Sequence, residues 1–191
     1  MDATQPATPA RLQRKGKKSG PVTEFLGLWT IKPGHAKQLI DEISAGLSSR
    51  GDVREGYARI GVHDARYVVL ENGTRLLITI SFDLDFDPYF DDAIASLVGG
   101  DKSRVQFGWM DHLEEAPEGG YESLSWEGFK NWLTETQTEA DIFANTNDAT
   151  VPEIDKALRV QQAFQQVLDH PDAAQALQHP ALKPLLEEAA G

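Results

Sequence analysis

Alternation of apolar and polar residues is clearest over residues 62–83, where two strand-like segments flank Asn72-Gly73. An Asn-Gly pair between alternating segments is the strongest short-range signal of a β-hairpin with a two-residue turn. Such a turn pairs Glu71 with Thr74 and sets the register of every later pair. The sequence therefore predicts two antiparallel strands that are adjacent in one sheet.

Helices are predicted between the strands. Residues 24–31 and 103–113 are rich in strand formers, whereas residues 35–50 and 86–100 carry apolar side chains at helical spacing. The predicted order is β-α-β-β-α-β, which is the ferredoxin-like split unit of an α+β protein.

The sequence beyond residue 114 predicts mostly helical structure. It predicts a loop, a short helix after Ser125, a short strand at 139–145, a helix opened by Thr150-Val-Pro-Glu153, and a last helix at 172–189 broken by Pro180 and Pro184. We expect three regions: a disordered basic arm (1–20), a ferredoxin-like domain (21–114), and a loop, strand and C-terminal helices packed on that same domain (115–191).

The hairpin presents two different faces in this register. One face is apolar and is expected to pack under the helices; it holds His63, Ala65, Tyr67, Val69, Leu76, Ile78, Ile80 and Phe82. The other face mixes Val68, Leu70 and Leu77 with a polar end, and both helices of a split unit cover only one side of the sheet. A second copy closing over the other face would bury its apolar part, so we expect a homodimer with a cavity between the sheets.

The composition narrows the range of functions. The 191 residues have a net charge of −12 and no cysteine, and residues 1–20 carry +4 of this total, which leaves −16 for the rest. A body this acidic repels phosphate backbones, so we expect no nucleic-acid partner. No apolar run is long enough for a membrane span, and the absence of cysteine suits a reducing cytoplasm, which is the expected location.

The polar end of the hairpin is the first candidate site. It gathers Asp64, Arg66, Thr79, Ser81 and Asp83. Arg66 could anchor an anionic ligand, held by Asp64, or the two could form an ion pair that neutralises a dimer interface. His63 at the end of the apolar face could be a base or a satisfied core histidine, and a single β-bulge would swap its face.

Other candidates are weaker. Trp109 and His112 could line the mouth of a pocket, or His112 could be an ordinary surface histidine. The acidic run at 83–92 has neither the glycine nor the downstream glutamate of a calcium loop, so we expect no metal site there and interpret it as a strand end followed by helix N-terminal charges. The chain has no phosphate-binding glycine loop and no G-x-S-x-G or H-E-x-x-H motif.

The predicted order of elements resembles the dimeric α/β-barrel superfamily, which includes small monooxygenases, chlorite dismutase-like proteins and dye-decolorizing peroxidases. The segment "VHDARYVVLENGTRLLITISFD", followed by "DPYFDDAIA", looks like a bacterial group found near or fused to peroxidase- and catalase-like proteins. Its hairpin reads approximately H-F-A-R-W, then L-L-F-T-S-x-[FY]-D, then a helix with Y-x-D-D. The matching residues are His63, Ala65, Arg66, Asp83, Tyr89, Asp91 and Asp92, while Asp64 stands where the group has an aromatic residue. The resemblance implies a ferredoxin-like fold, a dimer and a cavity.

Two functions follow as hypotheses. The first is a small-molecule enzyme, oxidative by analogy with the superfamily, in which Arg66 anchors an anion and His63 or His112 serves as base or haem ligand. The second is a non-catalytic binding or accessory protein. The partners expected are a second copy of the chain and a small molecule.

Overall fold

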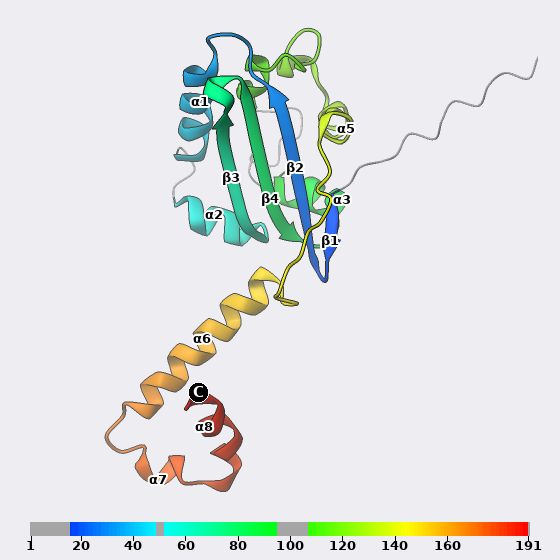
Figure 1. The fold of residues 1–191 in the computed structure, drawn as a ribbon. Coiled ribbons are helices and arrows are strands. Elements are labelled where there is room, and N and C mark those ends of the chain that lie inside the picture. The colour runs from blue at the N-terminus through cyan, green and yellow to red at the C-terminus, as the bar shows by residue number, and fades with distance from the viewer. Residues whose placement is uncertain (1–15, 49–51, 95–106, 191) are drawn as a thin grey trace, which may run out of the picture. The chain divides into compact units, whose positions relative to one another are not determined.

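A four-stranded antiparallel sheet organises the first part of the chain (Figure 1). The computed structural model describes residues 16–48, 52–94 and 107–190. The strands are β1 (Lys17–Ser19), β2 (Val22–Thr30), β3 (Val62–Leu70) and β4 (Arg75–Asp83), in the order β1-β2-β4-β3. This arrangement confirms an α+β protein. It also corrects the disordered arm predicted for 1–20, because residues 17–19 form a strand; residues 1–15 lie outside the described part.

The hairpin has the predicted register but a different turn. Leu70 pairs with Arg75, as the two-residue turn requires. The connection itself is a 3-10 turn, η1 (Glu71–Gly73), with Glu71 and Asn72 in the left-handed region at φ 50° and 56°. The ladder therefore ends one pair earlier than predicted, and Glu71 does not pair with Thr74.

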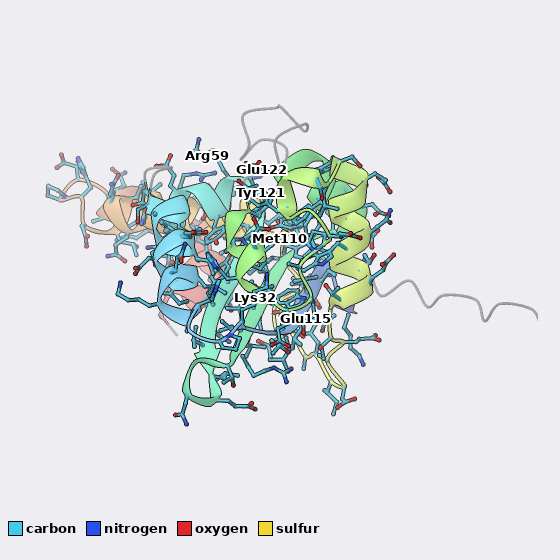
Figure 2. The ribbon with its side chains drawn as sticks, turned by 90° about the horizontal axis from the view of Figure 1, so that it is seen from above. Lys32, Arg59, Met110, Glu115, Tyr121 and Glu122 are labelled. Carbon is cyan, nitrogen blue, oxygen red and sulfur yellow. The ribbon has the colours of Figure 1, made fainter. Side chains whose placement is uncertain are left out.

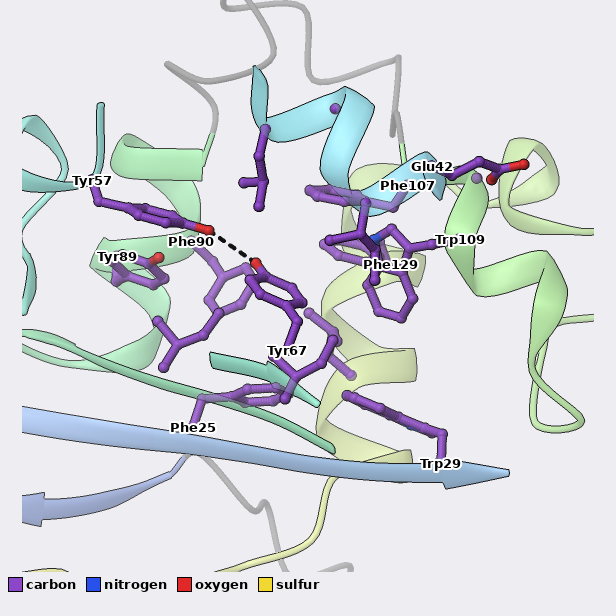
Figure 3. Close-up of a pocket in the computed structure, with 17 residues that line it drawn as sticks. Phe25, Trp29, Glu42, Tyr57, Tyr67, Tyr89, Phe90, Phe107, Trp109 and Phe129 are labelled. Atoms are coloured by element: carbon purple, nitrogen blue, oxygen red, sulfur yellow. Dashed lines mark hydrogen bonds between the residues drawn. The ribbon is translucent and has the colours of Figure 1, made fainter. Parts of the chain in front are cut away.

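The helices of this unit pack on one face of the sheet, and Figure 3 shows them above the strands. They are α1 (Ala36–Ser48), α2 (Val53–Arg59), α3 (Phe86–Pro88), which continues as the π-helical turn η2 (Tyr89–Ile94), and α5 (Trp126–Thr136). The face predicted to be apolar supplies the core, in which Leu76 and Phe82 are fully buried, as is Leu39 of α1. Gly51 and the end of the second predicted helix lie outside the described residues.

The predicted fourth strand at 103–113 is wrong where the structure describes it. Residues 108–112 form the 3-10 helix η3 (Gly108–His112), and the chain then reaches the sheet only at Leu113, which makes an isolated bridge to Ile31. A 3-10 helix η4 (Tyr121–Ser123) follows. The strand predicted at 139–145 is also wrong, since none of these residues is in a strand and the isolated bridge to Leu26 comes from the preceding residue, Thr138. The edge of β2 that faces away from β4 is thus covered by β1, by the segment around Leu113 and by Thr138. These three contacts limit the number of unpaired backbone groups at that edge.

The C-terminal residues Pro152–Gly191 form a compact unit of their own. Helix α6 (Val151–Leu168) begins where the capping sequence predicts. The last predicted helix is divided into α7 (Ala174–Leu177), η5 (Pro180–Leu182) and α8 (Lys183–Ala189), since Pro180 has no N–H to continue α7. Within the described residues, no helix has the length and apolar character needed to cross a membrane.

Candidate active site: an aromatic cavity under helix α1

A cavity of about 130 Å³ lies between the sheet and the helices that cover it (Figure 3). Its described lining is dominated by aromatic rings. These are Phe25, Trp29, Tyr57, Tyr67, Tyr89, Phe90, Phe107, Trp109 and Phe129. Aliphatic side chains such as Ile43 and Leu133 fill the spaces between the rings. The cavity therefore offers a largely apolar interior with a few polar groups at defined points, which is the usual composition of a ligand site.

Gly27 of β2, which has no side chain, leaves the space that the Trp29 indole occupies at the floor of the cavity. Phe25, Gly27 and Trp29 alternate on the helix-covered face, and the indole of Trp29 lies where a side chain at position 27 would be. The ring stacks on Trp132 of α5 at 5.6 Å between centroids, and its Nε1 donates to Thr136 Oγ1 at 2.9 Å. Gly27 thus allows a tryptophan to lie flat along its own strand.

Tyrosine hydroxyls mark one end of the cavity. The hydroxyl oxygens of Tyr57, from α2, and Tyr67, from β3, lie 3.1 Å apart (Figure 3). Tyr89 is buried and stacks on Phe82 at 3.9 Å between ring centroids. Burial, with a smaller contribution from Tyr57, raises the pKa of Tyr89, so its hydroxyl stays neutral at physiological pH.

A carboxylate marks the opposite end. Glu42 of α1 lies beside Phe107 and Trp109 at the rim (Figure 3). Its Oε1 is 3.1 Å from Nε2 of the buried His112, an ion-pair distance whose angle is too bent for a good hydrogen bond. His112 Nδ1 in turn lies 2.9 Å from Nδ1 of His35.

The backbone around His112 is held from two sides. Lys32 donates twice: its N–H to the His112 carbonyl at 2.9 Å and its Nζ to the Asp111 carbonyl at 2.8 Å. The Asp111 carboxylate accepts from the N–H of Tyr121 at 2.8 Å, and Figure 2 shows Lys32 and Tyr121 on either side of Met110. The position of His112 behind Glu42 is therefore set by several contacts.

The contact between the two histidines needs one donor and one acceptor. If His35 donates its Nδ1 proton to His112 Nδ1, the proton of His112 is on Nε2, which lies 3.1 Å from Glu42 Oε1 without forming a hydrogen bond.

Most of the predicted polar cluster lies on the other face of the sheet, away from this cavity. Asp64 is opposite Ser81, and Arg66 is opposite Thr79. Arg66 donates to Asp64 at 3.1 Å, and 68% of its side chain is exposed. The pair is open to solvent and contributes little to stability.

Glu24 on β2 completes this cluster. It pairs with Ser81 across the sheet. Burial raises the pKa of Glu24, and the Arg66 guanidinium partly opposes that rise. Sequence reasoning did not include Glu24, because the pairing of β2 with β4 is a long-range contact.

His63 does not belong to the apolar face, which corrects the prediction. A β-bulge falls between Val62 and Asp64, so Val62 rather than His63 is opposite Phe82. The Nε2 of His63 lies 2.7 Å from Asp83 Oδ1, and the same carboxylate accepts from the N–H of Val151 at 3.0 Å. Both side chains are largely buried, so this is a partnered structural contact rather than an open base.

Trp109 lies in the cavity lining, and His112 lies behind it in contact with Glu42. His112 is buried rather than on the surface. The tyrosines and Glu42 were missed as site residues, because nothing local distinguishes them from ordinary core and helix-surface positions.

The described residues do not fit a haem. Neither His63 nor His112 lines the cavity, and the ring nitrogens that make contacts face Asp83, Glu42 and His35. The cavity also has room for about one six-membered ring rather than a porphyrin. Across residues 16–48, 52–94 and 107–190 there is no cluster of three or more acidic, histidine or cysteine side chains that could hold a metal ion.

Comparison of the chain with protein-family models, curated proteins and solved structures found no match. The resemblance to the dimeric α/β-barrel superfamily therefore stays a prediction, and the case for a function depends on the geometry of the site.

Proposed function

We propose that this protein binds a small, mainly apolar molecule in the aromatic cavity between the sheet and helix α1. The observation that carries the proposal is the cavity itself, because native cores rarely leave voids larger than a water molecule. Apolar cavities of about 150 Å³ admit a benzene molecule, so the volume here suits one ring or a short aliphatic chain. The tyrosine hydroxyls and Glu42 then fix the orientation of the ligand.

A glycine pair in the helices provides a matched test. Gly46 of α1 is in the described lining of the cavity, whereas Gly56 of α2 is not; a Cβ at either position meets no atom of the described residues within 4 Å. A leucine at position 46 extends over the mouth of the cavity, and one at position 56 extends into open space. We expect wild-type protein to bind benzyl alcohol saturably in a fluorescence or NMR titration, and Gly46→Leu to weaken that binding by at least about tenfold.

Gly56→Leu is the control and should bind benzyl alcohol as the wild type does. Circular dichroism of both variants verifies that the fold is retained. Failure of the wild-type protein to bind, or equal binding by Gly46→Leu, would contradict the proposal.

A catalytic role is the second candidate. The contacts of Glu42 with His112 and of His112 with His35 favour it, because carboxylates and imidazoles are the side chains that most often act as general acids or bases. An oxidative reaction, as the superfamily resemblance suggests, would need an oxidant that enters the same cavity. Ligand turnover that is lost in Glu42→Gln, while benzyl alcohol binding is kept, would distinguish an enzyme from a binding protein.

We also propose that two copies pair through the sheet face that the helices leave uncovered. Leu28, Leu77 and Val68 form one row across three strands of this face, and none of them belongs to the buried core of the described residues. Both charge signs occur beside the row, in Asp64 and Arg66, so the face is self-complementary.

Light scattering at micromolar concentration tests the pairing. We expect a dimer, and we expect Leu77→Arg to convert it to a monomer. Ile142→Arg, at a residue that is 86% exposed in a loop, is the control and should remain dimeric. A wild-type monomer would overturn the pairing and leave the cavity proposal unaffected.

A further inference from the structure

We infer that the ligand of the aromatic cavity is a small organic cation, with an ammonium group directed toward Glu42. This inference rests on the proposed function, since it names the chemical class of molecule that the cavity binds. It is carried by the charges and ring positions around the rim.

The described lining of the cavity has an acidic side chain and no basic one. It contains nine aromatic side chains and one acidic side chain, Glu42, and it contains no lysine, arginine or histidine. An anionic ligand would find no cation in this lining and would approach a carboxylate. The net charge of −12 adds to that repulsion and favours the approach of cations.

The rings at the Glu42 end are placed to receive a cation. Phe107 and Trp109 line the cavity next to Glu42, whose carboxylate points outward from the rings at the rim (Figure 3), and their ring centroids are 6.4 Å apart with the planes at 76°. The negative face of an aromatic ring attracts a cation within about 6 Å, and tryptophan does so most strongly. A molecule in the cavity whose ammonium group reaches the mouth would therefore meet both these rings and the carboxylate at the outer rim.

One carboxylate oxygen of Glu42 is already in contact. Its Oε1 accepts from Gln38 Nε2 at 3.3 Å and lies 3.1 Å from His112 Nε2 without a hydrogen bond to that nitrogen. The other oxygen faces Gly108, where a Cβ would come within 3.3 Å of it. The absence of a side chain at Gly108 leaves this oxygen room to accept from a ligand N–H.

The far end of the cavity suits the other end of such a ligand. The paired hydroxyls of Tyr57 and Tyr67 provide donors and acceptors without charge. A primary amine with an apolar body, with or without a hydroxyl group at its other end, matches both ends of the cavity.

Three probes of nearly equal shape test the inference. Benzylamine is a cation at neutral pH, benzyl alcohol is neutral and benzoate is an anion. We expect benzylamine to bind wild-type protein about fivefold to thirtyfold more tightly than benzyl alcohol, and benzoate to bind most weakly. Titrations at constant ionic strength measure all three.

Two variants locate the source of the preference. Glu42→Gln keeps the shape of the side chain and removes its charge, so the preference for benzylamine should fall to less than about twofold. Asp41→Asn removes one charge from the neighbouring residue, which is exposed and paired with Lys37, and should leave the preference unchanged. An equal loss in both variants would mean that only net charge matters and would overturn the role of Glu42.

The outcomes separate the two proposals. Equal binding of benzylamine and benzyl alcohol overturns the cation inference while the cavity proposal stands. Saturable binding of none of the three probes overturns the cavity proposal itself.

Discussion

Replacing Gly27 by alanine should destabilise the sheet-bearing unit by about 1–5 kcal/mol, although alanine is the smallest possible change. A Cβ at this position would lie 1.8, 2.2 and 2.5 Å from the Cη2, Cζ3 and Cζ2 atoms of Trp29. Carbon atoms in contact are ordinarily about 3.5–4.0 Å apart. The indole must therefore move by more than about 1 Å, and it is fully buried.

The cost follows from what holds the ring. If the indole shifts but remains in its buried site, overpacking costs about 1–3 kcal/mol. If it leaves, the stack on Trp132 and the hydrogen bond to Thr136 are lost, and vacating a buried aromatic site costs about 3–5 kcal/mol. Either outcome is a large share of the roughly 5–15 kcal/mol that stabilises a typical domain.

Urea denaturation followed by tryptophan fluorescence measures the effect. All four tryptophans lie at or before residue 132, so their fluorescence reports the sheet-bearing unit, which ends at Val151. Trp29→Phe should relieve the clash, so Gly27→Ala should cost at least about 1 kcal/mol less in that background. A loss below about 1 kcal/mol for Gly27→Ala alone, or no coupling with Trp29→Phe, would refute the reasoning.

Three further predictions concern stability. Gly46→Ala should stabilise the protein by about 0.5–1 kcal/mol in the same urea assay, because a helical position gains alanine without a clash; a loss of stability would show that the site is crowded. Asp83→Ala should lower the free energy of unfolding by about 2–3 kcal/mol, because it leaves His63 and the N–H of Val151 without their acceptor. Asp85→Ala, at an exposed ion pair, should lower it by less than about 0.5 kcal/mol. Similar losses in the two variants would contradict the buried contact. Burial raises the pKa of Tyr89, so above pH 10 the folded state keeps a proton that the unfolded state loses. The free energy of unfolding should therefore fall with rising pH by about 1.4 kcal/mol per pH unit from this residue alone. Tyr89→Phe should make that fall shallower, and an unchanged slope would rule out Tyr89 as its source.

The elements predicted correctly are those with a strong local signal. The alternation on either side of Asn72-Gly73 predicts the hairpin register, and the capping sequence at Thr150 predicts the start of α6. Both signals depend on neighbouring residues only. The predicted strand at 103–113 failed for the opposite reason, because its strand formers were a weak local preference that tertiary context overrode.

The bulge at His63 shows how one residue changes a site prediction. Side chains alternate with a period of two, so a single extra residue moves every side chain before it to the other face. Here the bulge places Val62 on the core face and brings His63 to Asp83. Nothing in the local pattern distinguishes this arrangement from a regular strand.

The amino-acid sequence determined the class of fold, the hairpin, most helix positions and the acidic character of the protein, because periodicity, caps, turns and charge are local or additive properties. Only the tertiary structure decided where a ligand could bind. The described lining of the cavity comes from β2, β3, β4, α1, α2, α5, η2 and η3, which are spread along the chain, and the cavity volume depends on how their side chains pack. Packing is a property of all these contacts together, so neither Glu42 nor the three tyrosines could be recognised until the fold had brought them to one cavity.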